Sequence, residues 1–142
     1  IRTGYWNYNT ADTSLRDLII GEQHHIYTVL SFVMMNHNAP GTANVGCTVS
    51  LLGYELNGGN TAQTIQLFRV GALDGQQTFV WNDKFSFNGC EGTDFTGAMD
   101  SIADQNLVVD QATATSQKLR MQKGHNDDNW SCCITYIDQN NA

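Results

Sequence analysis

The chain has 142 residues, enough for a single domain with a core of its own. Seven basic residues against 14 acidic ones give a net charge of −7, which argues against nucleic acid as a partner because such a surface repels phosphates. No apolar stretch approaches the length that crosses a bilayer, so we expect no contact with membranes. Charged residues make up only 15% of the chain, and 14 Asn, 10 Gln, 14 Thr and 13 Gly supply the remaining polarity. This composition is typical of an all-β protein with many turns.

The first segment, "IRTGYWNYNTADTS" (residues 1–14), crowds Tyr5, Trp6 and Tyr8 into a polar stretch. One interpretation is an edge strand whose aromatic rings cover the domain. The other is an N-terminal arm whose rings anchor on a neighbouring subunit, since Trp and Tyr are favoured at interfaces. The sequence does not choose between them. We treat residues 1–14 as an arm or edge segment and residues 15–142 as one β-sandwich domain.

The next segments give one ambiguous and one strong signal. "TSLRDLII" (13–20) is a candidate for a short helix, as is a later stretch at 92–103. "IYTVLSFVMMN" (26–36) is apolar at both odd and even positions, which is typical of a central strand covered on both faces.

Further strands follow at short intervals. "VGCTVSLLGYEL" (45–56) alternates, and the turn signal "NGGN" precedes a strand at 64–70. "QTFVWNDKFSF" (77–87) alternates most clearly. Its four aromatic residues share one face, interrupted only by Asp83: Phe79, Trp81, Phe85 and Phe87. Shorter strands are expected at 106–110 and 117–122, before the final "NWSCCITYID" (129–138). Seven or eight strands at this spacing predict an antiparallel β-sandwich that resembles a jelly roll.

The adjacent Cys132 and Cys133 raise the question of redox or metal chemistry. Neighbours in a strand point to opposite faces, so the pair cannot bind one metal ion without distortion of the strand. We therefore interpret Cys132 as a small core residue. The four cysteines do not resemble a secreted disulfide framework, so we expect mostly reduced thiols and an intracellular setting. A bridge from Cys47 to Cys132 or Cys133 requires adjoining strands, which the sequence leaves open.

No pattern points to catalysis or to a cofactor. There is no G-x-S-x-G elbow and no C-x-x-C or H-x-x-x-H spacing. All four histidines lie near carboxylates in polar turns: His24, His25, His37 and His125. We expect surface histidines, no bound metal, no cofactor, no catalytic residues and no enzyme activity.

Several segments together resemble small β-sandwich structural proteins of tailed-bacteriophage particles. They are Tyr27-Thr28-Val29, "SFVMMNHN" (31–38), "CTVSLL" (47–52), "TFVWNDKFSF" (78–87), "QNLVVD" (105–110) and "CCITYID" (132–138). The likeness is a pattern of strands and turns over most of residues 15–138. Residues 88–104 depart from it, because this loop is longer and more acidic than the pattern expects. The resemblance implies a head-decoration, head-fibre or tail-accessory protein, often a homotrimer.

The sequence therefore predicts a capsid decoration or cement protein in the virion, assembled in the host cytoplasm. Its partner would be the major capsid protein or another virion protein, and Tyr5, Trp6 and Tyr8 would be the anchors. The alternative is a carbohydrate-binding or adhesion module. In that case Trp6, Asn129 and Trp130 would form the sugar site.

Overall fold

The computed structural model describes residues 1–41, 46–54, 62–92 and 114–140, and every regular element among them is a β-strand. The strands are β1 (Arg2–Tyr8), β2 (Arg16–Ile20), β3 (His25–Asn36), β4 (Cys47–Tyr54), β5 (Ala62–Val70), β6 (Thr78–Trp81), β7 (Phe85–Asn88), β8 (Cys90–Gly92), β9 (Ala114–Ser116), β10 (Lys118–Lys123) and β11 (Trp130–Asn140). The expected turn at 57–60, helix at 92–103 and strand at 106–110 lie wholly or almost wholly outside the described residues. Among the described residues there is no helix that is long and apolar enough to cross a membrane.

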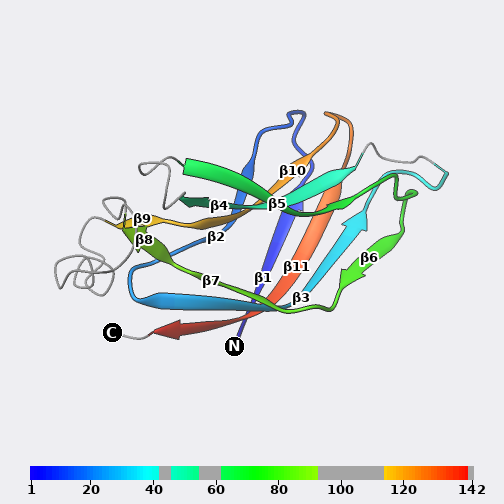
Figure 1. Ribbon diagram of the computed structural model, residues 1–142. Helices are drawn as coiled ribbons and strands as arrows, with labels where there is room; N and C mark the ends of the chain where they lie inside the picture. Colours follow the sequence, from blue (N-terminus) through cyan, green and yellow to red (C-terminus); the bar gives the residue numbers. More distant parts are fainter. Residues whose placement is uncertain (42–45, 55–61, 93–113, 141–142) are drawn as a thin grey trace, which may run out of the picture.

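Two sheets face each other and form a sandwich (Figure 1). We call the first sheet A; its order is β1-β11-β3-β6, and β7 also pairs with β3. The second, sheet B, has the order β2-β10-β4-β5. All of these pairs are antiparallel. Strands β8 and β9 form a separate two-stranded ribbon beside the sandwich.

The strand order is that of a jelly roll. β6 and β7 both pair with β3, so they count as two halves of one strand, and the sandwich then has eight strand positions. In chain order the first position pairs with the eighth, the second with the seventh, the third with the sixth and the fourth with the fifth. This is one long antiparallel hairpin rolled up so that β11 meets β3 and β10 meets β4. The expected antiparallel sandwich is confirmed, with a somewhat larger number of strands.

The core lies between the sheets and is mostly aromatic and branched. Phe32 from sheet A meets Phe68 of sheet B edge-on at 5.6 Å, and Phe68 stacks on Trp81 at 4.6 Å between ring centroids. The four aromatic residues of 77–87 do share the inner face and pack on this core. Their strand is broken at residues 82–84, where Asp83 interrupts the apolar alternation, so it becomes β6 and β7.

Strand β3 owes its two apolar parities to a bulge rather than to cover on both faces. Val29 pairs with Tyr136, and Ser31 pairs with Thr135, so Leu30 is an extra residue without a partner on β11. The buried positions are odd before the bulge (Tyr27, Val29) and even after it (Phe32, Met34). The strand is present as predicted, but the prediction that both of its faces are covered was wrong. A β-bulge reverses which side chains point inward, so apolar residues occur at odd positions before it and at even positions after it.

Residues 16–20 form β2, so the helix considered for 13–20 is also corrected. Leu18 and Ile19 are both buried in this strand, although they are neighbours. Leu119 pairs with Ile19 and Arg120 pairs with Asp17, which leaves Leu18 as an extra, bulged residue. Two adjacent buried residues imitate a helical pattern because a bulge turns both toward the core.

Candidate binding face

The three N-terminal aromatic residues lie on β1, an edge strand that pairs with β11 over its whole length. Tyr5 projects outward and is 78% exposed, whereas Tyr8 is 1% exposed. Trp6 is half-buried and packs against the core. Residues 2–8 are thus an edge strand of sheet A and not a detached arm, and of the three rings only Tyr5 is fully presented to a partner.

Local contacts explain why Tyr8 is buried. The Arg16 guanidinium lies 5.0 Å from the centroid of its ring and the Lys123 ammonium 4.8 Å from it. The Tyr8 hydroxyl donates a hydrogen bond to the Ser14 carbonyl. Burial raises the pKa of this hydroxyl above its usual value. Tyr8 is a structural residue of the sandwich end.

The position of the Trp6 ring requires a glycine at residue 4, which lies two residues earlier on the same face of β1. A Cβ atom at Gly4 would lie 2.1 Å from Cη2 of the Trp6 ring, so the indole lies directly over Gly4. Any side chain at residue 4 would displace the ring. The ring therefore covers the open edge of the core.

The residues of the predicted sugar site do not present a common surface. Trp130 has no exposed surface and belongs to the core. The Asn129 backbone N–H donates to Oδ1 of Asn38, at the start of β11. A sugar stacks on the exposed face of an aromatic ring. Because the Trp130 ring is fully buried, it cannot bind a sugar in this way. The alternation of 129–138 indicated this burial, because it placed Trp130 on the same side as Cys132.

Among the paired strand positions that the structure describes, the outer face of sheet A carries no charged side chain. The pairing of β1, β11, β3, β6 and β7 defines its positions in rows. They are Thr3, Tyr5, Asn7, Ser131, Cys133, Thr135, Ile137, Gln139, Ile26, Thr28, Ser31, Val33, Met35, Thr78, Val80, Ser86 and Asn88. Charged residues normally concentrate on surfaces, so a whole uncharged sheet face sets this surface apart in an acidic chain. We call it the neutral face.

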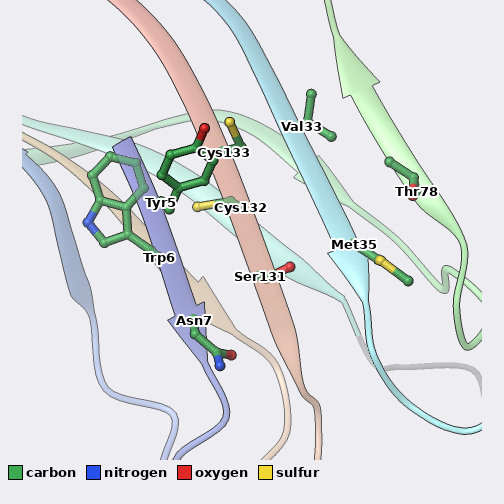
Figure 2. A pocket seen from close by; sticks show the side chains of 9 residues that line it. All are labelled: Tyr5, Trp6, Asn7, Val33, Met35, Thr78, Ser131, Cys132 and Cys133. Atoms are coloured by element: carbon green, nitrogen blue, oxygen red, sulfur yellow. The ribbon is translucent and has the colours of Figure 1, made fainter. Parts of the chain in front are cut away.

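A shallow depression of about 480 Å³ lies within the neutral face, beside β1 (Figure 2). Its apolar lining includes Val33, Met35 and Cys133, and its polar groups are those of Asn7, Ser131 and Thr78. Figure 2 shows Tyr5 beside Cys133, on the side of the depression away from Val33 and Thr78. Such a surface can bind a partner through apolar contact and neutral hydrogen bonds, without the cost of desolvating charges.

Sheet B differs, because ion pairs occupy its outer face. Asp17 on β2 accepts from Nε of Arg120 at 2.8 Å and lies 3.4 Å from Nζ of Lys118. Arg69 on β5 is exposed nearby, against a polar hollow that also includes Gln122. The two broad faces of the sandwich are thus chemically distinct, one charged and one neutral.

The cysteines confirm one prediction and answer one open question. Cys132 is buried in the core, as predicted from the alternation, and Cys133 lies on the neutral face. None of the four cysteines forms a disulfide, so neither Cys132 nor Cys133 is bridged to Cys47. Burial raises the pKa of the Cys132 thiol to about 12 and also raises the pKa of the Cys47 thiol. These buried thiols are poor nucleophiles, because the reactive species is the thiolate.

The histidines make pairwise contacts instead of a cluster. Nδ1 of His25 lies 2.6 Å from Oδ1 of Asp138, whose other oxygen is 3.3 Å from Nε of Arg2. Nε2 of His37 lies 2.6 Å from Oγ of Ser131. Within the ranges that the structure describes, no group of three or more His, Cys, Asp or Glu side chains is placed to hold a metal ion.

Fold and face together define a jelly-roll β-sandwich with one neutral and one charged face. In comparisons with known proteins, no family model, no curated protein and no solved structure matches this chain.

Proposed function

We propose that this chain is a structural protein of a virus particle, a decoration or accessory component of the tailed-bacteriophage kind, which covers or bridges capsid subunits. The observation that carries the proposal is the neutral face. A contact through it desolvates no charge, and its hydroxyl and amide groups can pair with backbone or side chains of a partner. Tyr5 is the exposed aromatic anchor at its border.

The jelly-roll fold is consistent with this role but does not distinguish it from other roles of the same fold. The same architecture serves viral capsid proteins and lectins, so the site must decide. An extended and uncharged face suits a large protein lattice better than a small charged ligand. Repetition on a particle also adds avidity, so each contact can be weak. The proposed partner is the major capsid protein or another virion protein, and the proposed location is the virion.

The test is co-sedimentation with particles of the virus that encodes the chain, prepared without this protein. We expect the wild-type protein to sediment with them and Val80→Glu to lose affinity by about tenfold or more, because a carboxylate would be buried unpaired at the contact. Val80 is 49% exposed on the neutral face, so the substitution should leave the fold intact.

Ile20→Glu is the matched control. Ile20 is 55% exposed and opposite Lys118 on sheet B, away from the neutral face. The Ile20→Glu variant should bind the particles with the same affinity as the wild type. The proposal fails if Val80→Glu and the wild type sediment equally, or if purified virions contain none of this protein by mass spectrometry.

A carbohydrate-binding module is the second candidate, and the depression beside Tyr5 favours it. The exposed Tyr5 ring borders the same depression as the polar groups of Asn7, Ser131 and Thr78, an arrangement of the kind that holds a sugar. This site replaces the one predicted from Trp6, Asn129 and Trp130. A glycan array tests it: binding that is lost in Tyr5→Ala and kept in Ile20→Glu supports a lectin, and silence across the array counts against one.

A further inference from the structure

The sandwich has four strand edges, and three of them are interrupted. On β5, Phe68 pairs with Val49 and Gln66 with Ser50, so Leu67 is a bulged extra residue. β2 is bulged at Leu18. The edge formed by β6 and β7 is broken at residues 82–84, which include Asp83 and Lys84. Bulges, breaks and charges of this kind are the means by which proteins prevent pairing of exposed edges with other chains.

The fourth edge, β1, has none of these devices. It makes seven consecutive pairs with β11 without a register shift and contains no proline. Its one charged residue is Arg2 at the end, where the guanidinium is paired with Asp138 at 3.3 Å. In the part of the chain that the structure describes, no strand pairs with the other side of β1. Half of its backbone N–H and C=O groups therefore point toward a missing strand.

We propose that this missing strand is β1 of a second copy of the chain, so that two sheets A join edge to edge as one continuous antiparallel sheet. Antiparallel pairing of two identical strands has two-fold symmetry, and each copy satisfies the other's backbone groups. The contact gives a dimer rather than the trimer that the resemblance implies. The proposal does not depend on the proposed virion function.

The side chains of β1 complement one another in a single central register. With Tyr5 opposite Tyr5 of the second copy, all seven residues pair and the two neutral faces lie on the same side of the joined sheet. Trp6 then lies opposite Gly4 of the second copy, and each indole keeps its place over the glycine of its own strand. On the neutral face, the two tyrosine rings form a cross-strand aromatic pair, which stabilises antiparallel sheets.

Electrostatics favour this edge over the others. The chain carries a net charge of −7, so most approaches of two copies bring like charges together. β1 contains no carboxylate, and the neutral face beside it contains no charge. Two copies can therefore approach along β1 with little repulsion, and the joined sheet presents one neutral face of twice the area.

The test is light scattering after size exclusion over a wide range of protein concentrations, on wild type and two lysine variants. We expect a species of twice the 15.7 kDa chain mass for the wild type. Tyr5→Lys places two lysines opposite each other at the dyad and should raise the dimer dissociation constant by about tenfold or more. Tyr5 is mostly exposed, so the monomer should keep its fold. Thr64→Lys, an equivalent change on exposed β5, should leave the dimer unchanged.

Hydrogen exchange on the wild type gives a readout that needs no variant. On dilution below the dissociation constant, the amides of β1 should exchange faster, while those of β5 should not change. A monomer or a trimer at all concentrations overturns the proposal. So does a dimer that Tyr5→Lys leaves intact, a dimer that Thr64→Lys weakens equally, or exchange in β1 that is independent of concentration.

Discussion

At the scale of single residues, the most unusual side chain is Lys123, which is 1% exposed. Lysine is almost never fully buried without partners, and here the ammonium has three. It donates to the carbonyls of Thr10, Asn126 (3.1 Å) and Asp128 (2.9 Å), which uses all three of its N–H groups. The Tyr8 ring covers the same ammonium. One side chain thus ties the segment after β1 to the turn between β10 and β11.

Replacement of Lys123 by Met should therefore destabilise the protein although it adds an apolar residue to the interior. The change leaves buried carbonyl groups without donors, and we expect the free energy of unfolding to fall by about 2–4 kcal/mol. Urea unfolding followed by tryptophan fluorescence measures it. Lys118→Met, which removes only a surface ion pair with Asp17, should cost less than about 1 kcal/mol. Equal stability of the two variants would show that the buried contacts of Lys123 contribute little.

At the scale of elements, the bulge at Leu30 determines which half of β3 faces the core. Before it, Tyr27 and Val29 point inward, and after it Phe32 and Met34 do. A strand without the bulge could bury only one of these pairs, since a shift by one residue exchanges the two faces. The extra residue is therefore necessary for the aromatic contact between Phe32 and Phe68.

Deletion of Leu30 should prevent folding, whereas Leu30→Thr should be tolerated. The deletion restores strict alternation and forces either the first or the second half of β3 to expose its core residues. We expect the deletion variant to show no cooperative thermal transition by circular dichroism. Leu30→Thr keeps the residue count and suits a strand, so it should lose no more than about 1–2 kcal/mol. A folded deletion variant would mean that β3 can shift its register without loss of the core.

The same bulges mark the limit of what the sequence predicts. Alternation correctly identified the inward face of 77–87 and the opposite directions of Cys132 and Cys133, because the period of a strand is a local property. It failed at Leu18 and Leu30, where an inserted residue reverses the phase and leaves no signal of its own.

The candidate site was less predictable, because it depends on which strands pair. The positions of Ser131, Cys133 and Thr135 could be assigned to one side of the last strand from the sequence alone. That they adjoin Val33 on one side and Tyr5 on the other follows only from pairing between distant segments. Likewise, the burial of Tyr8 depends on Lys123, which is remote in sequence, so the spacing of the N-terminal aromatics could not reveal it.

At the scale of the whole molecule, the core contains several weak acids that fold in their neutral form. Burial raises the pKa of Cys132 from the ordinary 9.0 to about 12 and raises that of Cys47 as well. It also raises the pKa values of the Tyr8 and Tyr27 hydroxyls above 10.0. In the unfolded chain these groups lose their protons at lower pH than in the folded one. The folded state therefore binds more protons in alkaline solution, and stability must fall as pH rises.

We expect the free energy of unfolding to stay level up to about pH 8 and then to decrease through the window from the ordinary thiol pKa of 9.0 to the folded value of about 12. Each buried thiol contributes up to about 1.4 kcal/mol per pH unit within its window. Urea titrations between pH 7 and 11 under reducing conditions measure the slope. Cys132→Ala should lower stability at neutral pH but show a shallower decline, because one of the titrating groups is gone.

Val49→Ala, a truncation of a fully buried residue that does not titrate, separates the two effects. It should lower stability at every pH and keep the wild-type slope, since it removes packing and no proton. A slope that is the same in Cys132→Ala and Val49→Ala would show that the Cys132 thiol does not cause the alkaline loss, and would assign that loss to Cys47 and the tyrosines. If the free energy of unfolding of the wild type stays level to pH 11, burial does not raise the pKa values of these thiols and phenols enough to couple their ionisation to unfolding.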